Sequence, residues 1–465
     1  MFPRAVAAVD LGATSGRVML GLVGHNELSV RPVARFPNGP VRREDGLHWD
    51  IDALYASVLA GLAAAVREEP QLSSIGVDSW AVDYALMAGG QMIAPPFHYR
   101  DDRTAAGVER VHAIADHAEL YGSNGLQFLP FNTLYQFAAE QNLADADGFL
   151  LVPDLINYWL TGRQVAEQTN ASTTGLLNLA TGQWDDALIE KLGFSRSLFP
   201  ELVTPGTTLG PVRDELGIRA DVVAVGSHDT ASAVVAVPAT NDDFAYISCG
   251  TWGLVGVELN SPVLTEASRA ANFTNEGGVD GRVRYLHNVM GLWLLSECVR
   301  DWQKEDASVD LLELLAAASA LTTTVPIFDA NDPRFLAPDG MPARIAAWCT
   351  EHDVAVPQSR VEFVRSIIES LSVAFVDAVH TASDLSGKSV SVIHIVGGGS
   401  QNEVLCQLIA DRSGMPVLAG PVEATAIGNV LVQARAQGFV EGSLEALRSL
   451  VAAAFSPKRY LPRSQ

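Results

Sequence analysis

The first residues suited to chemistry form the segment 10–17 (DLGATSGR), which holds two glycines, two hydroxyls, an aspartate and an arginine. Glycines let backbone N–H groups approach an anion closely, hydroxyls and arginine donate to it, and a carboxylate can hold a hydrated Mg²⁺. Apolar runs at 5–9 and 18–23 flank the segment and predict a strand, a tight turn and a second strand. The pattern favours a phosphate-binding hairpin. The alternative is an ordinary β-hairpin with glycine at positive φ.

A second reactive segment contains Ser227, His228 and Asp229. These neighbours cannot form a hydrolase triad, because a triad needs three groups that converge from separate segments. Asp229 follows a strand predicted at 221–225 and precedes a helix, and carboxylates in that position face the ligand crevice of an α/β sheet. The alternative is that Asp229 only caps the helix.

Three consecutive glycines occupy 397–399, between a strand predicted at 390–396 and a helix. Glycines in a row cost backbone entropy, which is understandable if a nucleotide base or ribose lies against the backbone. A flexible loop and a phosphate nest are the alternatives.

The segment 249–253 (CGTWG) lies between strands predicted at 244–248 and 254–259. It repeats the opening pattern of strand, turn and strand.

The segment 76–83 places two acids and a tryptophan between two predicted strands, at 74–78 and 83–87. Carboxylates accept hydrogen bonds from sugar hydroxyls and aromatic faces stack on sugar C–H groups, so Trp80 and Asp83 are candidates for sugar binding. A packed turn tryptophan is the alternative.

The segment 382–389 ends like a P-loop but has the wrong order of elements, with a helix before it and a strand after it. We interpret it as a helix C-terminus capped by Gly387.

The wider pattern predicts an α/β protein of two domains. Helices are predicted at 51–68, with Asp50 as N-cap, and at 359–384, while 104–200 is mostly helical with loops. A chain of 465 residues exceeds the usual size of one core. The repeated opening pattern suggests a duplicated domain, 1–240 and 241–465, with a cleft between the copies.

Composition narrows the classes of partner. The net charge of −23 argues against nucleic acid and anionic membranes as partners. The first apolar run is short and interrupted by Asp10, so neither a signal peptide nor a membrane helix is expected. The four cysteines are far apart, which predicts reduced thiols and a cytoplasmic location rather than zinc or disulfides.

Taken in order, these motifs resemble the actin-like (ribonuclease H-like) ATPase fold. Within it the chain resembles the FGGY carbohydrate kinases, and among those the rhamnulokinases. The resemblance covers nearly the whole chain through segments at 8–17, 77–83, 99–104, 132–136, 169–174, 227–233, 288–293, 394–402 and 419–424.

The resemblance implies two α/β domains with an active-site cleft between them, the first for sugar and the first phosphate turn, the second for nucleotide. It implies Asp229 as general base, Ala81 and His228 at the sugar, and Asp10 at Mg²⁺ through water. It implies ATP contacts at Ala13, Thr14, Ser15, Gly16, Arg17, Thr251, Asn288, Gly397, Gly398 and Gly399.

The implied reaction is ATP-dependent phosphorylation of a ketose, with L-rhamnulose and its primary hydroxyl as the first candidate. Three positions depart from the family pattern: Ala81 where glycine is more common, Cys249 in place of serine, and Ser296 in place of glutamine. The alternatives are a kinase for fuculose or xylulose, a non-catalytic sugar or nucleotide sensor, and a chaperone-like or filament-forming ATPase. A homo-oligomer is compatible with the sequence.

Overall fold

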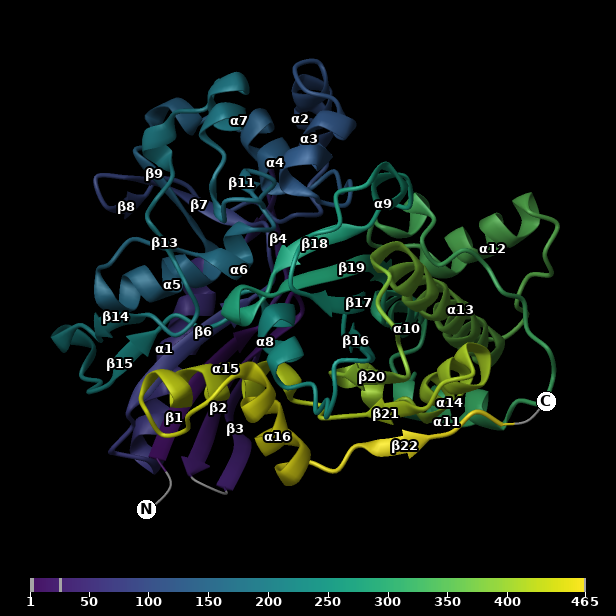
Figure 1. Ribbon diagram of the computed structural model, residues 1–465. Coiled ribbons are helices and arrows are strands. Elements are labelled where there is room, and N and C mark those ends of the chain that lie inside the picture. The colour runs from purple at the N-terminus through teal and green to yellow at the C-terminus, as the bar shows by residue number, and fades with distance from the viewer. Residues whose placement is uncertain (1–3, 25–26, 464–465) are drawn as a thin grey trace. The chain divides into compact units, whose positions relative to one another are not determined.

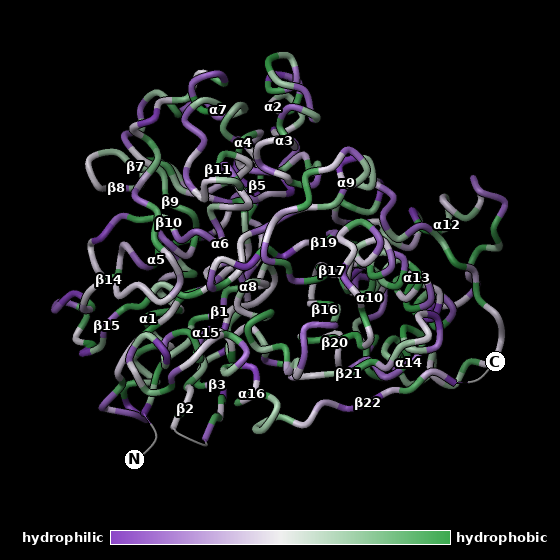
Figure 2. Tube along the Cα trace, in the orientation of Figure 1, coloured by the Kyte–Doolittle hydropathy of each residue, from purple (hydrophilic) through white to green (hydrophobic). Residues whose placement is uncertain are grey.

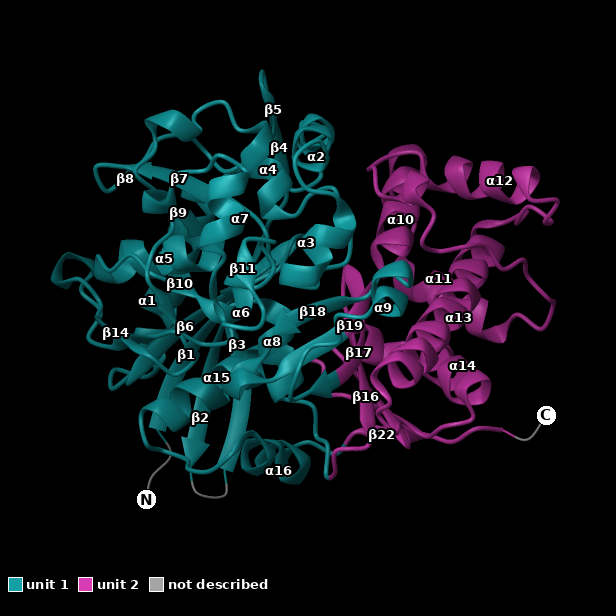
Figure 3. Ribbon diagram, turned by 45° about the horizontal axis from the view of Figure 1, so that its top comes forward, with its two compact units in different colours: residues 1–240, 258–285, 423–456 teal, residues 241–257, 286–422, 457–465 magenta. Residues whose placement is uncertain are grey.

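Figure 1 shows the computed structural model, which describes residues 4–24 and 27–463. The chain forms two compact units, coloured separately in Figure 3. The first comprises residues 1–240, 258–285 and 423–456, and the second comprises 241–257, 286–422 and 457–465. The first unit therefore takes in two later segments besides 1–240. None of the described helices has the length and apolar character needed to cross a membrane.

The first unit is built on a six-stranded sheet in the order β14-β15-β6-β1-β2-β3. β1 pairs with β2 in antiparallel fashion and with β6 in parallel fashion. Seven of the eight residues of β1 are buried, as expected for a central strand covered on both faces. The bounds are β1 Arg4–Leu11, β2 Ser15–Gly24, β3 Glu27–Pro37, β6 Ser74–Ser79, β14 Thr208–Pro211 and β15 Asp221–Val223.

A short hairpin of β4, Pro40–Arg43, and β5, Gly46–Trp49, precedes helix α1. Helix α1, Ile51–Glu68, has the predicted bounds. The Asp50 side chain accepts from Ala53 N, so the predicted N-cap is confirmed. Two further helices of this unit come from the end of the chain, α15 Ala424–Ala436 and α16 Leu444–Ala454. α15 packs on α8, Asp229–Val235. A Cβ on Gly428 would lie 1.8 Å from Ser232 O, so only glycine allows this close crossing.

Between β6 and β15 the first unit carries an insertion of mostly short elements. Helices and loops predominate over 104–200, as predicted, but four short strands that were not predicted also lie there. Its core is rich in aromatic side chains, including Tyr84, Phe137 and Phe149. The helices are α2 Thr104–His112, α3 His117–Asn124, α4 Thr133–Ala139, α5 Val152–Thr161, α6 Gln168–Ala171 and α7 Asp186–Lys191. The short strands of the insertion are β7 Tyr84–Ala88, β8 Gln91–Met92, β9 Gly148–Leu151, β10 Ala166–Glu167, β11 Leu177–Asn178, β12 Gln183–Trp184 and β13 Leu202–Val203.

The second unit repeats the central pairing of the first. β16 pairs with β17 in antiparallel fashion and with β20 in parallel fashion, as β1 does with β2 and β6. The predicted echo of the opening hairpin is therefore present in the topology. The seven-stranded sheet of this region has the order β18-β19-β17-β16-β20-β21-β22. The strands are β16 Phe244–Cys249, β17 Trp252–Leu259, β18 Thr274–Gly277, β19 Val283–Met290, β20 Val392–Val396, β21 Val417–Ala419 and β22 Lys458–Tyr460.

The long helix predicted at 359–384 is α13, Arg360–Ser386, whose C-cap is Gly387 in the left-handed conformation. The P-loop-like segment is thus a helix C-terminus, as expected. In Figure 2 green, hydrophobic stretches occur in both units, so each contributes apolar residues to a core. The remaining helices are α9 Glu266–Ala270, α10 Trp293–Glu305, α11 Leu311–Ala320, α12 Met341–Glu351 and α14 Glu403–Ser413.

Candidate active site

The opening hairpin places Asp10 and Arg17 opposite each other. They are register partners on β1 and β2, and Arg17 Nε donates to Asp10 Oδ2 over 2.8 Å. Arg17 Nη1 also lies 2.5 Å from Glu423 Oε2. Burial raises the pKa of Asp10, and the Arg17 charge opposes that shift. Both ends of the guanidinium are therefore held by carboxylates of the same unit.

The turn itself exposes Thr14 and Ser15 and leaves Ala13 half-buried. Neither of its glycines has positive φ, so the alternative of an ordinary β-hairpin with glycine at positive φ is wrong. Gly16 packs against a ring instead, because a Cβ there would lie 2.1 Å from Phe36 Cε2 and the Phe36 side chain would have to move. Asn38 Nδ2 donates to Gly12 O over 2.8 Å and fixes the turn from β3's end, a contact with no local motif to reveal it.

Asp78 adds a second buried carboxylate beside Asp10. It is the register partner of Asp10 on the parallel strand β6 and is fully buried. Its pKa is raised well above the ordinary value, first by burial and then by the negative charges of Asp10 and Asp229. Asn429 Nδ2, from α15, donates to Asp78 Oδ2 over 2.5 Å. The sequence shows Asp78 as an acid at the end of a predicted strand. It does not reveal the contact with Asn429, which lies hundreds of residues away.

Asp229 is the first residue of α8, and it does not cap the helix. His228 occupies the N-cap position, without a side-chain cap hydrogen bond. Asp229 Oδ1 accepts from Thr230 Oγ1 over 3.1 Å and lies 3.4 Å from His228 Nε2. The Asp229 side chain is 31% exposed, and within the described chain no protein donor bonds to Oδ2. One carboxylate oxygen is thus anchored, and the other is available to a ligand.

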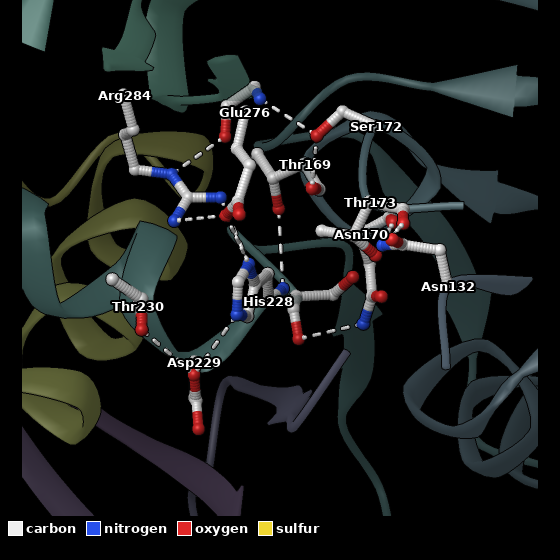
Figure 4. A network of polar contacts seen from close by, with 12 residues as sticks. Asn132, Thr169, Asn170, Ser172, Thr173, His228, Asp229, Thr230, Glu276 and Arg284 are labelled. Carbon is white, nitrogen blue, oxygen red and sulfur yellow. Dashed lines mark hydrogen bonds and ion pairs between the residues drawn. The ribbon is translucent and has the colours of Figure 1, made fainter. Parts of the chain in front are cut away.

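The ring of His228 belongs to a buried polar network, drawn in Figure 4. Arg284 Nη2 lies 3.0 Å from His228 Nδ1, and Arg284 Nη1 lies 3.1 Å from Glu276 Oε2. Glu276 Oε2 is also 3.3 Å from His228 Nδ1. Arg284 is fully buried and Glu276 is 5% exposed. Sequence reasoning missed both residues, because β18 and β19 carry no recognisable motif at these positions.

The segment before Asp229 is fixed by a buried glutamate. Glu167 Oε2 accepts from both Ser227 N, over 2.9 Å, and Ser227 Oγ, over 2.8 Å. Thr169 Oγ1 accepts from His228 N over 3.3 Å, which ties the same segment to α6. Burial raises the pKa of Glu167. Ser227 is therefore a structural hydroxyl, in agreement with the rejection of a hydrolase triad.

Asp83 and Trp80 lie in a packed aromatic cluster. Asp83 is 1% exposed, and its Oδ2 accepts from Trp49 Nε1 over 2.6 Å and from Trp80 Nε1 over 3.0 Å. Its Oδ1 accepts from Gln136 Nε2 over 2.9 Å. Burial raises the pKa of Asp83 to about 6 despite these donors. The alternative of a packed tryptophan fits this arrangement, and half-buried Ala81 is the more accessible neighbour.

In the second unit the glycine run packs on the turn that ends β16. Gly397 has φ +80°, and a Cβ there would lie 2.9 Å from Cys249 O. A Cβ on Gly399 would lie 2.2 Å from Cys249 Sγ, whereas one on Gly398 would meet nothing within 4 Å. Internal packing therefore accounts for two of the three glycines, and Gly398 alone has open space beside it. Burial raises the pKa of the Cys249 thiol, which keeps it neutral.

The turn at Thr251 is bonded to the segment that follows Asn288. Trp293 N donates to Thr251 O over 3.1 Å, and Leu292 N donates to Gly250 O over 3.0 Å. A Cβ on Gly291 would lie 2.4 Å from the carbonyl carbon of Trp252. The sequence-predicted nucleotide positions Thr251, Asn288 and 397–399 thus all lie in the second unit. The positions 10–17, 80–83, 228 and 229 all lie in the first.

The donor set near Asp10 suits a hard cation held partly by other ligands. Asp10 and Asp78 offer carboxylate oxygens, which Mg²⁺ prefers, and Asp78 Oδ1 is buried without a hydrogen bond to any described residue. Over residues 4–24 and 27–463, no group of three or more His, Cys, Asp or Glu side chains forms a metal cage. Mg²⁺ commonly binds through one or two carboxylates, water and phosphate, so the residues present fit it.

Two family models match most of the chain. The model of the FGGY family of carbohydrate kinases, N-terminal domain, matches residues 5–236, and that of the C-terminal domain matches residues 245–437.

Solved structures support the same fold. The ligand-bound xylulose kinase from Lactobacillus acidophilus has a TM-score of 0.78 and 17% identity, over 99% of this chain and 94% of that chain. The gluconate kinase from the same organism gives the same values. Plasmodium falciparum glycerol kinase with ADP has a TM-score of 0.78 and 14% identity over the same shares. The two family models, which together span most of both units, show that the chain belongs to the FGGY family of carbohydrate kinases.

Proposed function

We propose that this protein transfers the γ-phosphoryl group of ATP to the primary hydroxyl of a ketose, with L-rhamnulose as the preferred substrate. Family membership supports the reaction class. The substrate rests on the sequence resemblance to rhamnulokinases, carried by the runs at 227–233 and 288–293. A cytoplasmic role in rhamnose catabolism would follow from that substrate.

The observation that carries the proposal is the environment of Asp229. Its Oδ1 is anchored by Thr230 and faces His228, while Oδ2 is open to a ligand. A carboxylate held at one oxygen presents the other in a defined direction, which is what a general base needs. Phosphoryl transfer depends mainly on positioning and charge neutralisation, so such a base completes the requirements on the sugar side.

The proton of the reacting hydroxyl passes to Asp229 Oδ2 as the sugar oxygen attacks the phosphorus. The bond from phosphorus to the β,γ-bridging oxygen breaks, and ADP leaves with that oxygen. Asp229 then holds the proton until solvent removes it. We assign Ala81 and His228 to contacts with the sugar, and Trp80 and Asp83 to the wall behind it.

Mg²⁺, when bound, neutralises charge on the β- and γ-phosphates. Asp10 would hold it through water. The turn residues Ala13 to Gly16 would donate to phosphate, and Arg17 would add positive charge from its place between Asp10 and Glu423. On the nucleotide side, Thr251, Asn288 and the exposed Gly398 are the proposed contacts, with Gly397 and Gly399 shaping the turn.

The test is a substrate panel read by coupled ADP release, with L-rhamnulose, L-fuculose, D-xylulose, gluconate and glycerol at matched concentrations. We expect kcat/KM to be highest for L-rhamnulose. A higher value for another ketose would overturn the substrate and retain the kinase. Sugar-independent ATP hydrolysis, or no ATP consumption with any member, would overturn the kinase itself.

A further inference from the structure

The network behind His228 contains a fully buried arginine that no sugar or nucleotide assignment uses. Arg284 comes from the first half of β19, and Glu276 comes from β18. His228 is 6% exposed, so the whole cluster is shielded from water. A buried, charged cluster is costly unless its members are paired, which makes its arrangement informative.

The geometry determines which nitrogen of His228 carries the proton. An arginine guanidinium has donors only, so a contact of 3.0 Å between Arg284 Nη2 and His228 Nδ1 requires Nδ1 to be the acceptor. A neutral imidazole that accepts at Nδ1 carries its hydrogen on Nε2. The approach of Glu276 Oε2 to the same nitrogen, at 3.3 Å, would require the opposite tautomer if it were the hydrogen bond. The arginine contact is shorter, and Arg284 Nη1 already neutralises Glu276 at 3.1 Å.

Arg284 is itself held in place by a third contact. Its Nε donates to Gly277 O over 2.9 Å, so the guanidinium is fixed by β18 on one edge and by Glu276 on another. Gly277 is fixed in turn, because its backbone N donates to Ser172 Oγ over 2.7 Å. The guanidinium is thus aimed at His228 by contacts that do not involve His228.

We propose that Arg284 is a positioning residue that holds His228 as the neutral Nε2–H tautomer, so that this N–H is directed at Asp229 Oδ1 and the sugar beside it. Nε2 lies 3.4 Å from Asp229 Oδ1 (Figure 4). The donor orients the carboxylate and leaves Oδ2 as the oxygen that takes the substrate proton. The kinetic part of this inference rests on the proposed function, whereas the tautomer does not.

The direct test uses nuclear magnetic resonance of protein labelled with ¹⁵N-histidine. The chain has 10 histidines, and the spectrum of H228Q identifies the signals of His228 by their loss. We expect a neutral ring protonated at Nε2 in the wild type. An imidazolium, or a ring protonated at Nδ1, would overturn the proposal whether or not the protein phosphorylates any sugar.

The role of Arg284 is tested in the double variant E276Q/R284Q, which removes both charges together and so avoids a single buried charge that could prevent folding. We expect His228 to lose its fixed tautomer and kcat/KM for the ketose to fall roughly ten- to a hundredfold. The matched control is R282M, which removes a half-buried arginine paired with Glu445 and should leave both readouts unchanged. An unchanged His228 spectrum in the folded double variant would overturn the role of Arg284.

A second pair of variants leaves Arg284 in place. Glutamine can present an amide donor near the Nε2 position, whereas asparagine reaches only the Nδ1 position. We therefore expect H228Q to retain at least roughly tenfold more activity than H228N. Equal loss in both variants, or the reverse order, would contradict a donor at Nε2.

Discussion

Arg17 and Asp10 face each other across the first hairpin, as register partners joined by a 2.8 Å hydrogen bond from Arg17 Nε to Asp10 Oδ2. The arginine that the sequence assigns to phosphate is therefore engaged with the aspartate assigned to the metal. A guanidinium in this position lowers the cost of burying Asp10 and still places positive charge next to the turn.

Replacing Arg17 tests that relationship. We expect R17M to lower the free energy of unfolding by about 1–3 kcal/mol, because a buried carboxylate loses its partner, and to lower kcat. Urea unfolding and steady-state kinetics measure the two effects. The control is R35M, which removes the other arginine on Glu423 from a more exposed position. The prediction would be contradicted if R17M were as stable as R35M and differed from the wild type only in a raised KM for ATP. Arg17 would then serve the phosphate alone.

Asp83 predicts a change of stability with pH. Burial raises its pKa from 3.8 to about 6, so the folded state favours the protonated acid. The resulting stabilisation of the folded state is fully present below 3.8, the pKa of the unfolded state, and is lost as pH rises through about 6, the pKa of the folded state. Relative to D83N, the wild type should therefore lose up to about 3 kcal/mol of unfolding free energy between pH 4 and 7. Urea titrations followed by tryptophan fluorescence provide the measurement, and a difference that does not vary with pH would contradict it.

The glycine run predicts opposite behaviour for adjacent positions. A Cβ on Gly399 would lie 2.2 Å from Cys249 Sγ, so we expect G399A to destabilise the protein by about 1–3 kcal/mol. Gly398 has nothing within 4 Å of the same position, and G398A should leave stability nearly unchanged. Thermal unfolding compares the two variants.

Kinetics on G398A test the nucleotide assignment separately. If adenosine lies against Gly398, the added methyl group should raise KM for ATP several-fold while KM for the sugar is unaltered. Wild-type KM for ATP in G398A would remove Gly398 from the nucleotide site.

Much of the framework could be predicted because its signals are local. The bounds of α1 follow from an apolar periodicity and the Asp50 cap, and the two hairpins follow from short apolar runs on either side of small residues. The end of α13 at Gly387 is likewise a local signal. These patterns depend on neighbours in sequence, which a single chain displays.

The parts that could not be predicted depend on contacts between distant segments. Arg284 and Glu276 reach His228 from strands without a motif, and Asn429 reaches Asp78 from a helix near the end of the chain. The joining of 258–285 and 423–456 to the first unit has the same origin. Asp83 illustrates the converse, because a carboxylate at the start of a predicted strand, proposed to bind sugar, is bonded to two indoles within the core.

The central claim is that Asp229 removes the proton from the sugar hydroxyl, and D229N tests it most directly. The change keeps size and removes the base, so single-turnover phosphorylation of L-rhamnulose should slow roughly 10²–10⁴-fold, with sugar binding close to wild type by calorimetry. D221N, on β15 of the same unit, is the matched control and should retain full activity. Turnover by D229N close to the wild-type rate would contradict the account.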